Sequence, residues 1–206
     1  RAGVRVSVFE SFSPGLSDFS PLVARVRDQG AEVLISDTFF RDHLLLVRQM
    51  AQSSISVNAF LGAFGMEFPN VIKELGPASE GLFGTTSWQP GVTLGGSEKE
   101  SLAFIEAFKQ RFGRAPVPLT MHGYAAAKAL LKALEGVAAS GKPVTGGALR
   151  DALANVDIET PLGRVKFADN GDPLFYERVV IQIQGGKHMV VYPKARATAT
   201  VRYPAK

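Results

Sequence analysis

Short apolar runs alternate with longer amphipathic stretches over the first 88 residues. Valines at every second position predict a strand over residues 4–9, and further apolar runs predict strands over residues 31–35, 57–61 and 81–86. Apolar residues recur at helical spacing from Ser20 to Gly30, over residues 40–50 and over residues 69–75. Strands that alternate with helices predict an α/β fold, in which a parallel sheet is covered on both faces.

The pattern changes after Trp88. Pro90-Gly91 and Gly95-Gly96 mark a break, and Ser97 to Glu100 form a capping box that opens a helix. A second helix carries Tyr124, Leu130 and Leu134, and a third is expected over residues 145–154. Three successive helices supply no sheet of their own, so we expect them to pack on strands that are mostly absent from this chain.

The last forty residues return to β structure. A short strand is expected over residues 163–167, followed by a turn at residues 169–172. Strands over residues 178–184 and 188–192 flank Gly185-Gly186-Lys187, which predicts a hairpin. Residues 193–206 are expected to form an extended tail.

Composition narrows the class of protein. The 206 residues are 46% hydrophobic and 20% charged, with a net charge of +4 and no cysteine. The absence of cysteine excludes disulfides, thiolate metal sites and cysteine nucleophiles. No basic stripe indicates nucleic acid, and no apolar run is long enough to span a membrane. Because the chain opens directly into the predicted first strand, we expect the true N-terminus to lie upstream.

Chemistry-bearing motifs are scarce. The chain has no GxGxxG, P-loop or GxSxG motif. Its three histidines, His43, His122 and His188, lack a partner at metal-ligand spacing, so they are interpreted as helix-surface or helix-end residues. The turn at residues 169–172 is interpreted as an Asx-type turn because the later calcium ligands are missing. An enzyme is therefore the least favoured class, and no cofactor or metal is expected.

The carboxyl ends of the predicted strands are the remaining candidate site, because open α/β sheets bind ligands there. These ends carry aromatic and polar residues together, a composition typical of small-molecule pockets. For Phe39, Phe64 and Trp88, pocket lining and core packing remain open alternatives. The full candidate set is Asp37, Thr38, Phe39, Ala63, Phe64, Glu67 and Trp88.

The order of residues resembles the type I periplasmic binding proteins of the leucine/isoleucine/valine-binding family. Each segment is weakly specific, but together they follow the family pattern over nearly the whole chain. The matching segments are residues 18–23, 30–35, 47–50, 104–108, 112–116, 123–126, 149–153, 160–167, 182–187 and 192–193.

The resemblance implies two doubly wound α/β lobes that bind a ligand in the cleft between them. It assigns residues 1–88 to the C-lobe, 89–173 to a returning helical segment of the N-lobe, and 174–206 to a C-lobe return hairpin and tail. The strands of the N-lobe would then lie largely outside this chain, which accounts for the helices without a sheet.

The resemblance also bears on the ligand. Family members that bind α-amino acids place an aromatic hydroxyl and an acid at the positions of Phe39 and Phe64, where both serve the ammonium group. A phenyl ring cannot accept a hydrogen bond from a buried ammonium group, so we expect an aromatic or otherwise apolar carboxylate or amide instead of a standard branched-chain amino acid. Glu67 is the alternative acceptor.

The resemblance implies the solute-binding component of an ABC importer, which would dock on a membrane permease. Its location would be periplasmic or extracellular, with a signal peptide upstream of this chain. The alternative is a ligand-sensing regulator or receptor domain of the same fold without a transport role. A signal peptide would favour the importer.

Overall fold

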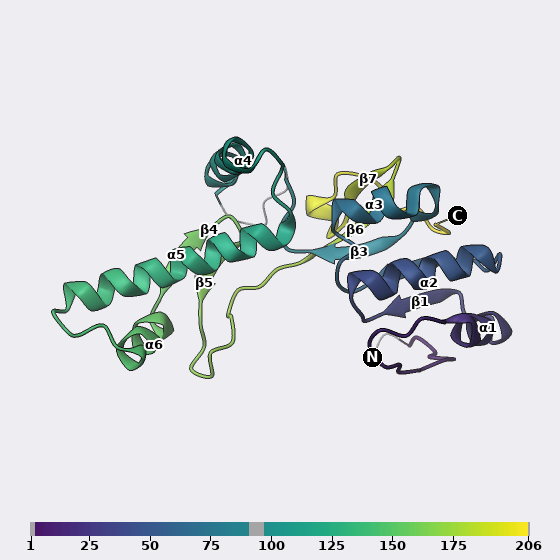
Figure 1. The fold of residues 1–206 in the computed structure, drawn as a ribbon, viewed down its shortest axis with the longest axis horizontal. Coiled ribbons are helices and arrows are strands. Elements are labelled where there is room, and N and C mark those ends of the chain that lie inside the picture. The colour runs from purple at the N-terminus through teal and green to yellow at the C-terminus, as the bar shows by residue number, and fades with distance from the viewer. Residues whose placement is uncertain (1–2, 91–96, 206) are drawn as a thin grey trace. The chain divides into compact units, whose positions relative to one another are not determined.

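The computed structural model describes residues 3–90 and 97–205, so the predicted break at Gly95-Gly96 lies outside the described residues. The chain divides into two compact units (Figure 1). Unit 1 comprises Arg1–Thr85 and Val179–Lys206, and unit 2 comprises Thr86–Arg178. The two units are described separately.

Unit 1 contains a five-stranded sheet with strand order β1-β2-β3-β6-β7. Strands β1 (Val33–Ser36), β2 (Ala59–Gly62) and β3 (Phe83–Thr86) run parallel, as expected from the alternation of strands and helices. Ser36 pairs in register with Gly62. The carboxyl ends of β1 and β2 therefore lie at the same edge of the sheet.

Helices α1 (Ser20–Asp28), α2 (Phe40–Gln52) and α3 (Pro69–Leu75) supply the apolar cover of this sheet. The predicted starts and ends of these helices agree closely with the structure. Helix α3 has the predicted bounds, and Gly30, predicted to end the first helix, follows α1 with a positive φ of 57°. The start of α1 differs slightly, because Phe19 and not Ser20 is the N-cap. Buried residues from α1, α2, α3, β2 and β6 form one core, including Phe19, Leu46, Phe60, Val71 and Ile183.

Strands β6 (Val179–Gln184) and β7 (Lys187–Tyr192) form the predicted hairpin. Both turn residues, Gly185 and Gly186, have positive φ, which a two-residue hairpin of this kind requires. Contrary to expectation, the C-terminal tail that follows is not extended throughout, because Lys194–Arg196 form a short 3-10 helix, η2. Hydrogen bonds attach the tail to β6. The buried side chain of Gln182 accepts a hydrogen bond from Arg202 N and donates one to Arg202 O.

The described residues of unit 2 form three helices and a two-stranded hairpin (Figure 1). The helices are α4 (Glu98–Phe112), α5 (Pro118–Ala139) and α6 (Gly146–Ala154), and α6 packs beside α5. The predicted cap of α4 is present, since the Ser97 hydroxyl accepts a hydrogen bond from Glu100 N at 3.1 Å. The hairpin pairs β4 (Asp157–Thr160) with β5 (Gly163–Lys166).

One expected strand is absent, and one observed strand was not expected. Residues 4–9 form no strand, and Val4, Val6 and Phe9 are exposed, because no neighbouring strand offers them a hydrogen-bonding ladder in the described chain. Strand β4 was not expected, since its four residues alternate acidic and other side chains without an apolar run. Among the described residues, no helix combines the length and the apolarity needed to cross a membrane.

Candidate functional site

The loops that follow β1 and β2 meet at one edge of the unit 1 sheet. The backbone N–H of Ala63 donates a hydrogen bond to Ser36 O at 2.9 Å, which joins the two loops directly. The Thr85 hydroxyl, on the neighbouring strand β3, donates to Ala63 O at 3.2 Å. Six of the seven predicted site residues lie on these two loops: Asp37, Thr38, Phe39, Ala63, Phe64 and Glu67.

Four phenylalanines form an aromatic cluster at this edge, here called the phenylalanine cluster: Phe39, Phe40, Phe64 and Phe68. The ring centroids of Phe39 and Phe64 are 5.9 Å apart with an edge-to-face arrangement, a favourable geometry for aromatic pairs. Phe64 makes a similar contact with Phe68 at 5.8 Å. Because Phe39 is 66% exposed, the cluster presents an aromatic surface to solvent that an apolar ligand can contact.

The polar residues of the site differ in accessibility. Asp37 is exposed. The Thr38 hydroxyl donates a hydrogen bond to the buried carboxylate of Asp42 in the first turn of α2, at 2.9 Å. Glu67 is buried in the loop after β2. Of these side chains, Asp37 is the most accessible to a ligand, and Thr38 is partly exposed.

Glycines shape the loop after β2. Gly65 has a φ of +90°, and a Cβ there would lie 2.8 Å from the Cβ of Phe40 at the start of α2. At Gly62 a Cβ would collide with Met66. Both positions therefore require glycine, and the loop packs closely against α2.

Two histidines hold this loop. His43 of α2 is fully buried, with Nδ1 2.9 Å from Phe64 O and Nε2 3.1 Å from Ser36 O. His188 of β7 places Nε2 2.8 Å from Met66 O. The interpretation as helix-surface or helix-end residues was wrong for His188, which lies on a strand; His43 does lie in the first turn of α2, but its ring is buried and not on the helix surface. Sequence spacing carried no signal for them, because their partners are backbone carbonyl groups from distant segments.

Trp88, the seventh predicted residue, belongs to unit 2. Its side chain has no exposed surface, packs with Ile105 and Met121, and donates from the indole nitrogen to the Ser101 hydroxyl at 2.9 Å. Of the two alternatives for Trp88, this environment supports core packing, because both its apolar surface and its one donor are already used.

A serine–histidine pair occurs in unit 2 that sequence spacing did not indicate. The Ser87 hydroxyl lies 2.8 Å from His122 Nε2, and Nδ1 of the same ring lies 3.1 Å from Pro118 O. The carbonyl can only accept, so Nδ1 is the donor and Nε2 accepts from the hydroxyl. Since Ser87 is buried, a substrate cannot reach its hydroxyl in this structure.

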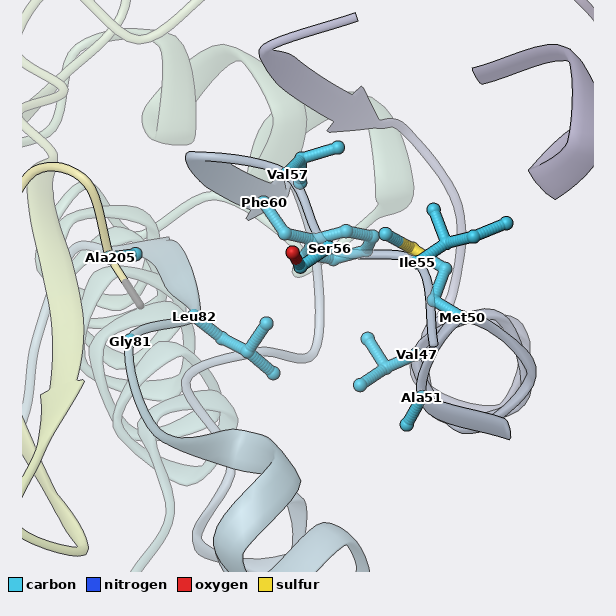
Figure 2. Close-up of a pocket in the computed structure, with 10 residues that line it drawn as sticks. All are labelled: Val47, Met50, Ala51, Ile55, Ser56, Val57, Phe60, Gly81, Leu82 and Ala205. Atoms are coloured by element: carbon cyan, nitrogen blue, oxygen red, sulfur yellow. The ribbon is translucent and has the colours of Figure 1, made fainter. Parts of the chain in front are cut away.

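A small apolar cavity of about 50 Å³ lies elsewhere in unit 1 (Figure 2). It is lined by α2, by the residues that precede β2 and β3, and by Ala205 of the tail. This volume accommodates little more than a water molecule or a methyl group. The cavity is therefore a packing defect near the amino ends of the strands and is too small for an organic ligand.

Other groups of polar residues have structural roles. Asn170 accepts a hydrogen bond from Asp172 N, which confirms the predicted Asx-type turn. Arg164 and Lys166 hold the pKa of Asp157 well below its usual range through hydrogen bonds across the β4–β5 hairpin. Within residues 3–90 and 97–205, no three histidine or carboxylate side chains are grouped as metal ligands would be.

Comparison with known proteins gives consistent matches. A family model described as periplasmic binding protein matches residues 1–187. The Leu/Ile/Val-binding protein homolog 7 of Brucella abortus (strain 2308) is 28% identical over 98% of this chain and 51% of its own length. The chain thus spans about half the length of the curated relatives it matches.

Solved structures show the same fold. A leucine-binding protein of Thermotoga maritima matches 87% of this chain and 49% of its own length, with a TM-score of 0.74 and 23% identity. An ABC transporter solute-binding protein of R. palustris, in complex with benzoate, matches 92% of this chain and 50% of its own, with a TM-score of 0.72 and 18% identity. This chain therefore shares the α/β fold of these proteins.

Proposed function

The chain belongs to the periplasmic binding protein family, and from that premise we propose that it forms part of the solute-binding component of an ABC importer. The observation that carries the proposal is the phenylalanine cluster, which lies at the carboxyl ends of β1 and β2 and is open to solvent at Phe39. Ligands of open α/β sheets bind beyond these strand ends.

We propose that the ligand is an aromatic or otherwise apolar carboxylate or amide. Phe39 and Phe64 supply ring surface and no acceptor for an ammonium group. Glu67 is buried, so it would have to move to serve such a group. The benzoate complex of the R. palustris protein is an example of an aromatic carboxylate bound by a protein of this fold.

In this proposal unit 1 is the C-lobe and unit 2 is part of the N-lobe. The ligand contacts in unit 1 are Asp37, Thr38, Phe39, Ala63, Phe64 and Glu67. Trp88 is assigned to the core of unit 2 instead of the ligand surface. The ligand would be bound in an inter-lobe cleft, and closure of the lobes around it would create the form that docks on a membrane permease, in the periplasm or outside the cell.

The test is a calorimetric titration of the intact protein with benzoate, phenylacetate, L-phenylalanine and L-leucine. Binding of one or both aromatic acids, with no heat from L-leucine, is the expected result. Phe64→Ala should weaken the binding of the aromatic acid by at least about fivefold, because an aromatic contact of this kind is worth about 1 kcal/mol beyond its buried area.

Phe9→Ala is the matched control, since Phe9 is a 91% exposed phenylalanine of unit 1 outside the phenylalanine cluster. It should leave the affinity unchanged. Binding of L-leucine with higher affinity than benzoate would overturn the ligand assignment and indicate that Glu67 accepts the ammonium group. An equal loss in both variants would show that the phenylalanine cluster is not the site.

A further inference from the structure

The net charge of the chain is concentrated in its last segment. Residues 193–206, the tail, contain Lys194, Arg196, Arg202 and Lys206 and no acidic residue. Because the whole chain carries a net charge of +4, residues 1–192 are neutral in sum. A run of one sign of charge is often only a solvated segment without defined structure, but it also attracts partners of the opposite sign. The way in which the tail is held separates these two cases.

Two glutamines of β6 hold the tail through its backbone. Gln182 has no exposed surface; its amide nitrogen donates to Arg202 O at 2.9 Å, and its oxygen accepts from Arg202 N at 2.9 Å. Gln184 is two positions along the strand, on the same face, and donates to Thr200 O at 2.9 Å. Buried amide groups are costly unless they are hydrogen-bonded, so these two side chains stabilise a defined conformation of the tail.

Further contacts hold the tail on both sides of these glutamines. Thr198 N donates a hydrogen bond to Val190 O of β7 at 2.8 Å, and Ala205 N donates to Asn58 O, just before β2, at 2.7 Å. A Cβ at Gly81 would lie 2.5 Å from Ala205 O, so the tail lies directly on bare backbone there (Figure 2). The tail is therefore a fixed part of unit 1, which attaches it by backbone groups and leaves its charged side chains for other contacts.

The charged and aromatic side chains of this region face solvent. Lys194 is exposed, and the side chain of Arg202 is 60% exposed although it pairs with Glu80 at 3.1 Å. Tyr203 is 54% exposed, and Tyr192, which immediately precedes the tail, is 65% exposed. Basic side chains beside exposed tyrosines are typical of surfaces that meet an anionic bilayer, where the cations contact phosphates and the phenol rings lie among the headgroups.

A carboxylate offsets part of this charge. Glu80 pairs with Arg202 and also accepts hydrogen bonds from Gly185 N and Gly186 N, in the β6–β7 turn, at 2.9 Å and 3.3 Å. Its negative charge is thus shared between the guanidinium group and two backbone donors. Lys187, which follows the turn, is exposed and adds a further positive charge. The surface formed by the turn and the tail therefore keeps an excess of basic groups.

We propose that Lys187, Tyr192 and tail residues 194–203 form a docking surface for a membrane that contains anionic phospholipids. Each Lys or Arg close to such a bilayer strengthens binding about fivefold, so a few together give a weak and reversible attachment that salt screens. The exposed tyrosines favour a bilayer over an acidic protein segment, because headgroups accept charge and ring surface without a matched shape. None of these residues is a proposed ligand contact, so the inference is independent of the ligand class.

The test is flotation of the intact protein with two kinds of vesicle, phosphatidylcholine alone and phosphatidylcholine mixed with phosphatidylglycerol. The wild type should bind the mixed vesicles at about 50 mM salt and dissociate at about 500 mM salt, because the screening length is then only a few ångströms. It should not bind vesicles of phosphatidylcholine alone. Equal binding to both kinds of vesicle, or binding to neither, would overturn the proposal.

The variant K194E/R202E reverses two charges of the tail and should weaken binding to the mixed vesicles at least about tenfold. The matched control is K142E/R150E in unit 2, since Lys142 is also exposed and Arg150 also pairs with a carboxylate, that of Asp151. The control should bind as the wild type does. Equal weakening in both double variants would show that total charge, and not the tail, determines binding.

Two further measurements complete the test. In K194Q/R202Q the two charges are removed without placing a carboxylate beside Glu80, so the tail stays attached, and binding to the mixed vesicles should still fall about fivefold. Soluble poly-L-glutamate is the second anionic probe. Binding of poly-L-glutamate that K194E/R202E abolishes, without binding to vesicles, would overturn the lipid assignment and indicate an acidic protein partner. The flotation assay contains no solute ligand, so a failure of the proposed ligand class leaves its result unaffected.

Discussion

The two units of this chain differ in the size of their apolar cores. In unit 1, side chains from three helices and from strands β2 and β6 form a large core, and Ala59, Phe83 and Val191 form a smaller second cluster. In the described residues of unit 2, three helices accompany a two-stranded hairpin, and the apolar clusters around Trp88 and Ala133 are smaller. Several large apolar side chains of α4 and α5 are exposed: Leu102, Phe112, Leu119, Leu130 and Leu131. The apolar face of an amphipathic helix therefore indicates that the helix needs a packing partner. It does not show that the partner belongs to the same chain.

The stability of unit 2 depends instead on a few specific interactions. One is the core around Trp88, whose indole packs with Ile105 and Met121. Another joins α4 to α5: the carboxylate of Glu100 accepts hydrogen bonds from Tyr124 and Lys128 at 2.7–2.8 Å. Lys128 also donates to Glu159 O on β4. The comparison thus predicts that single substitutions lower local stability more in unit 2 than in unit 1.

The largest effect is expected for Trp88→Ala. This change removes the most buried large side chain of unit 2 and leaves the Ser101 hydroxyl without its donor, at a cost of about 3–5 kcal/mol of unfolding free energy. Urea unfolding gives the cost, and native-state hydrogen exchange shows where it falls. Amides of α4 and α5 should lose protection, while those of β6 in unit 1 keep it.

Trp88→Phe is the matched variant, because it keeps an aromatic ring in the core and removes only the indole donor. It should cost clearly less than Trp88→Ala. If the amides of β6 lose protection to the same extent as those of α5, the units unfold as one, and the contrast between them is wrong.

The same contrast explains which features of the fold could be predicted. Local signals were sufficient where the partner is adjacent in sequence, as in the hairpin at Gly185-Gly186 and the Ser97 cap of α4. The alternation of apolar and polar residues over 4–9 predicted a strand wrongly, because a strand also needs a neighbouring strand to pair with, and the described chain offers none there. The firm attachment of the tail by Gln182 was not predicted either, since its partner Arg202 is twenty residues away.

The candidate site shows the same limit. The position of Phe39 and Phe64 at strand ends followed from the order of strands, and the structure places their rings in contact. His43 and His188 were missed as parts of the site because backbone carbonyl groups carry no sequence signal. A pattern of side chains can therefore indicate the surface of a site, while the residues that support it require coordinates.

A smaller effect on stability is expected from Tyr124→Phe, which removes a hydrogen bond between α5 and Glu100 of α4. Burial, together with the hydrogen bond to Glu100, raises the pKa of Tyr124 to about 12. Its pKa in the unfolded chain is about 10, so its contribution to stability is complete below pH 10 and is lost as the pH rises toward 12. Tyr124→Phe should cost about 1 kcal/mol at pH 7 and should reduce the alkaline loss of stability.

Urea unfolding of unit 2 at pH 7 to 11, followed by the fluorescence of Trp88, measures both effects. Tyr176→Phe is the control, because Tyr176 is an exposed tyrosine of the same unit. That variant should retain the alkaline loss of the wild type. The same alkaline loss in Tyr124→Phe as in the wild type would show that Glu100 and Lys128 join the helices without the tyrosine.

The smallest effect on stability is expected on the exposed face of α5. Leu131 is 59% exposed, so Leu131→Glu should change the unfolding free energy by less than about 0.5 kcal/mol. It should also reduce self-association, measured by sedimentation at increasing concentration, because it places a charge within an exposed apolar surface. Ala133, two residues away on α5, is only 2% exposed, and Ala133→Glu should unfold unit 2 by burying a charge. A large loss of stability in Leu131→Glu would mean that this face of α5 is covered in the intact protein. The exposure of Leu131 and its neighbours on α5 would then be a property of this chain alone, and not of the protein in which it functions.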